Sequence, residues 1–83
     1  MRLAQMGDWR ERITTDPAVM LGKPVVARTR ITVEQILRKL AAGMSIDEVL
    51  RDYPRLTRDD VLAALAYASD AVGSEDILLT GTG

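Results

Sequence analysis

Basic side chains of the kind that bind phosphates occur in two places along the chain. One is an extended stretch before the first predicted helix, and the other is the joint between the second and third predicted helices. Guanidinium groups suit phosphate oxygens and guanine edges. We therefore predict DNA binding by Lys23, Arg28, Arg30, Arg55 and Arg58. The alternative left open by the sequence is that the basic residues of the extended stretch cover a solvated strand face.

The residue types that most catalysis and metal binding need are missing from the sequence. The 83 residues include no Cys and no His, which excludes thiolate or imidazole zinc sites, Ser-His-Asp triads and disulfides. Paired carboxylates occur at 47–48 and 59–60, where they are explained as helix starts. The Gly22-Lys23-Pro24 segment lacks the further glycines of a phosphate-binding loop. We expect no enzymatic activity, no cofactor and no metal site.

Charge is distributed unevenly along the chain, although the formal net charge is only −1. Residues 1–58 carry all eleven Lys and Arg residues and seven acids, a balance of +4. Residues 59–83 carry five acids and no base, a balance of −5. Such asymmetry suggests two different partners, one of them anionic.

Length and composition are those of one small globular domain. Hydrophobic residues make up 47% of the chain and charged residues 28%. A chain of this length buries only somewhat over about 60% of the surface that its unfolded form exposes, and it often needs a partner to be stable. The first residues have no signal-peptide pattern, and no apolar run is long enough to span a membrane. We expect a cytoplasmic location.

The chain before residue 33 has the composition of strands and turns. β-branched residues predict a strand over 25–32, and a shorter one is predicted over 12–14. Two short strands need helices or a second chain to be stable. We predict dimer contacts at Ile13, Val25, Val26 and Ile31. Residues 1–10 are predicted as a loose arm, in which Trp9 packs at the edge of the core or in a dimer contact. Stacking of Trp9 on a base is the third alternative.

From residue 33 the apolar residues follow the helical period of 3.6. The first predicted helix begins after Thr32 and ends at Gly43, the expected left-handed C-cap. The second opens with a Ser45-x-x-Glu48 capping box and ends at Pro54. The third opens with the segment Thr57-Arg58-Asp59-Asp60 and is predicted to end at Gly73.

The predicted fold class is therefore mainly α, a tri-helical helix-turn-helix with a short N-terminal β element, completed in a dimer. Residues 11–73 form the predicted domain, between the arm and an acidic tail over 74–83. This tail contains an apolar triplet, which calls for a partner surface. The alternatives are that it folds back onto the core or that it is a flexible end. The triplet is Ile77, Leu78 and Leu79.

An ordered set of motifs resembles one protein family over about residues 9–69. The motifs are RITTDP at 12–17, GKPVV at 22–26, TRITV at 29–33, IL at 36–37, LAAGMS at 40–45, YPRLT at 53–57 and AALAYA at 63–68. The set resembles domain-of-unknown-function family 433, whose members are often described as VapB-like antitoxins. The resemblance implies a homeodomain-like helical domain with an N-terminal β element. It also implies dimerisation and pairing with a PIN-like ribonuclease toxin.

The chain differs from the usual pattern of that family at two positions. Arg28 stands where the family usually has Gly, and Thr32 stands where it often has Pro. Glycine adopts a positive φ more readily than other residues, so Arg28 predicts a straighter ribbon with one more positive charge.

The predicted function combines these observations. We expect an antitoxin that binds operator DNA through the basic residues and neutralises a PIN-like toxin through Ile77, Leu78 and Leu79. The alternative is a stand-alone protein-interaction or structural module without DNA affinity.

Overall fold

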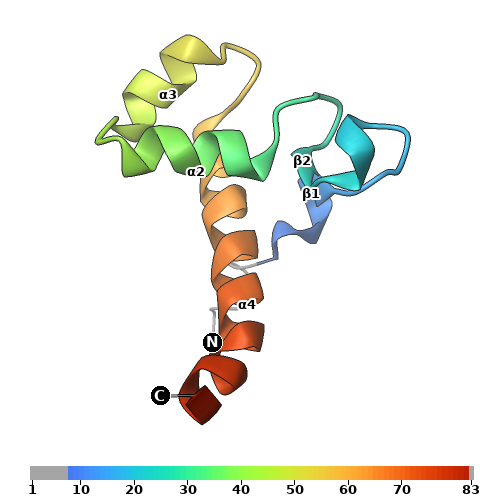
Figure 1. Cartoon of the computed structure of the whole chain (residues 1–83). Coiled ribbons are helices and arrows are strands. Elements are labelled where there is room, and N and C mark those ends of the chain that lie inside the picture. Colours follow the sequence, from blue (N-terminus) through green and yellow to red (C-terminus); the bar gives the residue numbers. More distant parts are fainter. Residues whose placement is uncertain (1–7, 83) are drawn as a thin grey trace.

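The computed structural model describes the backbone of residues 8–82 and the side chains of residues 8–73. A small two-stranded element lies beside one end of α2, α3 packs near the other end, and α4 projects away from both (Figure 1). In chain order the elements are η1 (Trp9–Glu11), β1 (Ile13–Thr14), η2 (Met20–Gly22), β2 (Val25–Val26), α2 (Val33–Ala41), α3 (Ile46–Asp52) and α4 (Arg58–Thr82). The fold is mainly helical with a short antiparallel β element, as predicted.

The first two helices begin and end where the sequence predicts. The Thr32 hydroxyl accepts from the Gln35 amide at 3.0 Å, and the Gln35 side chain accepts from the Thr32 amide at 2.9 Å. Ser45 and Glu48 make the same reciprocal pair at the start of α3. Each pair satisfies amides that a helix start leaves without partners. Gly43 takes the left-handed φ of 98° that was predicted after the first helix.

Helix α4 begins as predicted and extends further than predicted. Asp60 accepts from the Thr57 amide at 2.9 Å, and the Thr57 hydroxyl accepts from the Asp60 amide at 3.2 Å. The predicted stop at Gly73 is wrong, because the helix runs through it to Thr82. Gly73 does not adopt the left-handed φ of a C-cap glycine. A helical Gly costs only about 1 kcal/mol relative to Ala, and no proline follows it to stop the helix.

The predicted tail is therefore a continuation of α4 along its backbone. The side chains of Ile77, Leu78 and Leu79, predicted to bind a toxin, lie outside the described residues.

The hydrophobic core is built by all three helices together with the strands. Ile36 of α2, Val49 of α3, and Val61 and Ala64 of α4 are completely buried. The strands pair antiparallel, with Ile13 opposite Val26 and Thr14 opposite Val25, and they pack on this core.

Three of the four predicted dimer residues belong to the core of a single chain. Ile13, Val25 and Val26 are buried, and Ile31 is half-buried against the same cluster. The helices of the same chain cover these strands, so no second chain is needed to bury them. Burial within one chain leaves Ile13, Val25 and Val26 little surface for dimer contacts, and the dimer contact of Ile31 stays a prediction.

Trp9 packs at the edge of the core, one of its three predicted roles. Its ring meets Tyr67 edge to face, with 4.8 Å between the ring centroids, and its Nε1 donates to an Asp70 carboxylate oxygen at 2.7 Å. These contacts tie η1 to α4, so the predicted loose arm is ordered at Trp9 and Arg10. Within the described residues, no helix combines the length and apolar character that crossing a membrane requires.

Candidate nucleic-acid interface

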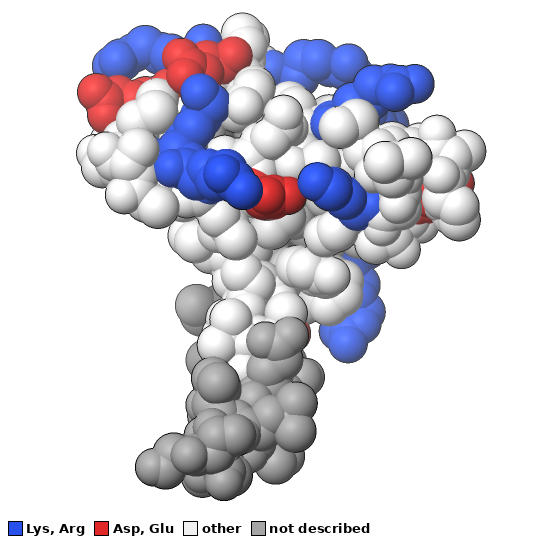
Figure 2. Space-filling model, in the orientation of Figure 1, with Lys and Arg blue, Asp and Glu red and all other residues white. Residues whose placement is uncertain are grey.

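Five basic side chains form ion pairs with carboxylates in the described part of the chain. Red and blue side chains are interleaved on the face drawn in Figure 2. The pairs are Arg10 with Asp8 (3.9 Å), Arg12 with Asp60 (3.0 Å) and Asp59 (3.7 Å), Lys23 with Glu34 (3.2 Å), Arg38 with Glu34 (2.7 Å), and Lys39 with Asp52 (2.9 Å). Lys23, one of the predicted DNA-binding residues, thus has a carboxylate partner within the chain, which it shares with Arg38.

Three of these pairs shift the pKa of one of their members. Hydrogen bonds from Arg38 and then Lys23 lower the pKa of the Glu34 carboxyl below its ordinary value of 4.5. The hydrogen bond to Asp52 raises the pKa of Lys39 above its ordinary value of 10.5. Both groups therefore keep their charges near neutral pH.

Five arginines form no ion pair with any carboxylate that the structure describes. They are Arg28, Arg30, Arg51, Arg55 and Arg58. Four of them belong to the predicted DNA-binding set. All five are exposed, so their charges are available to an anion in solution.

Two adjoining open hollows bring three of these arginines together. One has a volume of about 480 Å³ and the other about 450 Å³, and Arg28, Thr29 and Arg55 line both. Arg30 lines the second hollow. Blue side chains lie along the upper edge of Figure 2, over the segment that joins β2 to α2. We call Arg28, Arg30 and Arg55 the arginine cluster.

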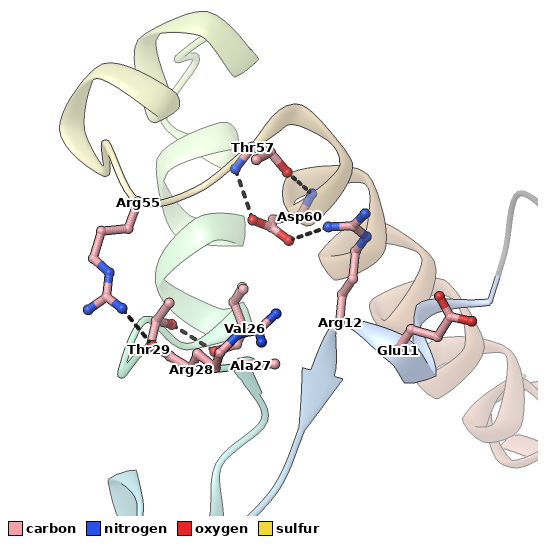
Figure 3. Close-up of a pocket in the computed structure, with 9 residues that line it drawn as sticks. All are labelled: Glu11, Arg12, Val26, Ala27, Arg28, Thr29, Arg55, Thr57 and Asp60. Carbon is pink, nitrogen blue, oxygen red and sulfur yellow. Dashed lines mark hydrogen bonds and ion pairs between the residues drawn. The ribbon is translucent and has the colours of Figure 1, made fainter.

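A hydrogen bond joins the two basic regions that the sequence placed apart. Nη2 of Arg55, from the joint between α3 and α4, donates to the backbone carbonyl of Arg28 at 2.9 Å (Figure 3). This contact spans 27 residues of sequence. The helix joint and the extended stretch therefore form one surface, which their positions in the sequence do not show.

Arg28 lies in a tight turn and adopts a left-handed backbone conformation, with φ 67°. The Val26 carbonyl accepts from the Thr29 amide at 3.0 Å and from the Thr29 hydroxyl at 2.8 Å. A positive φ at the third turn position favours Gly. The predicted straighter ribbon is wrong, because Arg28 takes the conformation expected of Gly. The predicted strand over 25–32 ends at Val26 for the same reason.

Thr29 holds this turn from both sides. Its hydroxyl donates to the Val26 carbonyl and accepts from the Ile31 amide at 3.0 Å. Two local hydrogen bonds from one side chain offset part of the cost of a left-handed arginine, which is about 1–2 kcal/mol.

The opposite wall of the first hollow is closed by an ion pair that sequence reasoning missed. Asp60 is only 8% exposed. One of its carboxylate oxygens accepts from the Thr57 amide, and the other accepts from Arg12 Nη1 at 3.0 Å (Figure 3). The acidic pattern of the helix start predicted the cap, but no local pattern reveals a partner 48 residues away. Arg12 is thus a structural residue that links β1 to α4.

The exposed face of α4 has little of the chemistry of a DNA-reading helix. Arg58 and Asp59 are exposed, but Asp60 is buried in the cap. The next large exposed side chains are Leu62 and Leu65. Arginines that suit phosphates are instead concentrated on the turn and the helix joint, beside the carboxylates of Glu11 and Asp16, which also line the hollows.

Comparisons with known proteins match the part of the chain that contains the candidate interface. The model of the family "Protein of unknown function (DUF433)" matches residues 13–68, a range that contains the arginine cluster and Asp60. The uncharacterised protein y4eO of Sinorhizobium fredii is 34% identical over 67 residues. That match covers 81% of this chain and 30% of the relative, so this chain spans less than a third of the relative's length.

A solved structure shows the same fold. The crystal structure of a DUF433 member protein from Anabaena variabilis superposes with a TM-score of 0.72 at 27% sequence identity. The match covers 94% of this chain and 77% of that one. Family match and structural match agree over the three helices and the β element, and the chain belongs to the DUF433 family.

Proposed function

We propose that this protein binds operator DNA through the arginine cluster, as the DNA-binding part of an antitoxin. One observation carries the proposal: three of the five arginines without an ion pair gather on one surface, while the other basic residues of the described chain contact carboxylates. Positively charged side chains that form no ion pair in the described chain are available for an anionic ligand. Lys23 contributes less than the sequence suggested, because Glu34 neutralises it.

The chemistry of the cluster suits the phosphate backbone more than base edges. Arg28 and Arg55 both line a hollow about 480 Å³ in volume (Figure 3). Contacts with phosphates position a protein on DNA, and base contacts supply sequence preference. The exposed face of α4 beyond Arg58 offers leucines rather than base-reading side chains. We therefore expect affinity from the cluster with modest sequence discrimination.

The antitoxin half of the proposal rests on the family resemblance and on charge. The partner that the resemblance implies is a PIN-like ribonuclease. A ribonuclease binds RNA through positive charge, and residues 59–83 of this chain carry five acids and no base. An acidic helix end suits such a surface, with Ile77, Leu78 and Leu79 as the predicted apolar contacts.

Titration with DNA across salt concentrations tests the DNA-binding half. The full chain is titrated with the duplex found upstream of its own gene and with a shuffled duplex of equal length. Each phosphate neutralised contributes a slope of about −0.9 in log affinity against log salt, so three arginines predict a slope of about −3 per chain. Absence of binding even at low salt would overturn this half.

Co-expression with the product of the adjacent gene tests the antitoxin half. If that gene encodes a PIN-like nuclease, the full chain should restore growth of the host. A chain cut after Val72 should fail to do so while its core remains folded, because α4 then lacks its last turns. Full neutralisation by the shortened chain would refute the assignment of residues 74–83.

The second candidate function is a protein-interaction module without DNA affinity. The observation in its favour is the exposed apolar face of α4. The salt titration separates the two candidates, because such a module binds neither duplex at any salt concentration.

A further inference from the structure

The rest of the chain leaves part of the apolar surface of α4 uncovered. Asp60, Val61 and Ala64 are buried, whereas Leu62, on the flank of this buried face, is 44% exposed. Val72 lies three turns after Val61 on nearly the same side of the helix, and it is 58% exposed. Apolar residues that line one side of a helix normally have something packed on them. The uncovered apolar surface of α4 therefore needs a partner.

The exposed positions on this face follow a regular spacing. They are Leu62 and Leu65, then the small exposed residue Ser69, then Val72. The steps are 3, 4 and 3 residues, which is the spacing of a seam between paired helices. We call these four residues the α4 stripe.

The spacing of the α4 stripe is the same in both chain directions, because its centre lies at residue 67. When two copies run antiparallel about that centre, Leu62 of one lies opposite Val72 of the other, and Leu65 lies opposite Ser69. Large side chains then meet smaller ones at every level. Such self-complementarity is what a two-fold symmetric interface requires.

Charge favours the antiparallel arrangement over the parallel one. In antiparallel pairing, Arg58 of each copy lies level with position 76 of the other, an aspartate in the sequence. Residues 59–83 carry five acids and no base, whereas residues 1–58 have an excess of bases. Parallel pairing would bring the two acidic ends together, which repel each other.

The arrangement of the fold leaves room for this pairing. Figure 1 shows α4 extending well beyond the other elements, toward the C-terminus. Its 25 residues span about 37 Å at about 1.5 Å per residue. The buried residues of α4 pack in the core, beside the stripe. In an antiparallel pair the two domains thus lie at opposite ends of the interface.

We propose that two copies of this chain dimerise through antiparallel contact of their α4 stripes. The proposal does not depend on DNA binding, since the arginine cluster and the stripe are separate surfaces. It replaces the strand residues Ile13, Val25 and Val26, which the core of one chain already buries, as the source of dimer contacts.

Cysteine cross-linking tests both the dimer and its direction. The natural chain contains no Cys, so every thiol in a variant is a designed one. The double variant Leu62→Cys/Val72→Cys should form a covalent dimer almost completely under mild oxidation. Each single variant should remain monomeric on a denaturing gel. In the antiparallel pair, residue 62 of one copy lies about 15 Å along the helix from residue 62 of the other copy, which is too far for a disulfide. Cross-linking of the single variants would indicate parallel pairing and would overturn the proposal.

Sedimentation equilibrium of the full chain gives the second readout. Leu65→Glu should weaken dimerisation at least 100-fold, because two carboxylates would face the seam, with the far-ultraviolet circular dichroism unchanged. The matched control Arg38→Glu, on the exposed side of α2, should leave dimerisation unchanged within about twofold. A natural chain that stays monomeric at high micromolar concentration would overturn the proposal. The proposal would also be overturned if the cysteines placed in the α4 stripe reacted with thiol reagents in the free chain and were protected only when a toxin was bound. The occupant of the stripe would then be a different protein.

Discussion

The outer face of α2 and the turn after β2 use the same basic residue types in opposite ways. On α2, Glu34 lies one helical turn before Arg38 and also meets Lys23, so each charge has a partner. Around the turn, Arg28 and Arg30 pair with no carboxylate that the structure describes. The number of arginines therefore says little about binding. What matters is whether the fold has already neutralised them.

The two regions also differ in how well local sequence and backbone agree. Thr32 and Gln35 cap α2 with the side chains that a helix start prefers. Arg28 instead takes a φ of 67°, where Gly would be less strained. Local conflicts of this kind concentrate at functional positions. A strained arginine that makes no ion pair within the described chain is consistent with a role in binding.

The largest effect is expected from breaking a structural ion pair, at Asp60. Asp60→Ala removes the cap acceptor of the Thr57 amide and the partner of Arg12. We expect a loss of about 2 kcal/mol in the free energy of unfolding, from a lost cap and a broken charged hydrogen bond. Urea denaturation measures it.

The neighbouring carboxylate provides the matched control. Asp59 has the same charge and lies on the same helix turn, but it is exposed and 3.7 Å from Arg12. Asp59→Ala should change stability by less than about 0.5 kcal/mol. Equal losses for the two variants would show that the buried pair has no special structural role.

A smaller effect of opposite sign is expected at Arg28. Arg28→Gly relieves the left-handed strain and should raise stability by up to about 1 kcal/mol, since Gly adopts positive φ freely but loses more entropy on folding. The same variant should bind DNA more weakly, with a salt slope reduced by about 1. Thermal unfolding and the salt titration measure the two effects. Lower stability would mean that the Arg28 side chain supports the fold.

The smallest expected effect is a pH dependence of stability, which comes from the ion pairs of Glu34 on α2. Because its pKa is lowered in the folded chain, the Glu34 carboxylate stabilises the fold above its ordinary pKa of 4.5. That contribution disappears as the pH falls through the lower, folded-state pKa. Unfolding midpoints of the natural chain and of Glu34→Gln should therefore differ at neutral pH and converge in acid. A constant difference at all pH values would contradict the pairing.

Local patterns predicted the helices because their signals are close together in sequence. The caps at Thr32, Ser45 and Thr57 lie within three residues of their partners. The end of α4 was missed because Gly73 can terminate a helix or continue it, and the choice depends on the residues that follow.

The candidate site was predicted in part. The sequence pointed to Arg28, Arg30 and Arg55, but it could not place them on one surface, because a hydrogen bond across 27 residues joins the two regions. The neutralisation of Lys23 by Glu34 depends on how α2 packs beside the β element. Long-range contacts of this kind have no signature in the spacing of residues along the chain.

Two double variants of equal charge test whether DNA binding depends on the arginines without ion pairs. Arg28→Gly/Arg30→Ala removes two charges from the arginine cluster, and Arg10→Ala/Arg38→Ala removes two charges from ion pairs. If the arginine cluster binds phosphates, the first variant flattens the salt slope of DNA binding by about 2. The second should leave the slope within about 0.5 of the natural value. Equal slopes for the two variants would contradict DNA binding by the arginine cluster, because binding would then follow net charge alone and not the unpaired arginines.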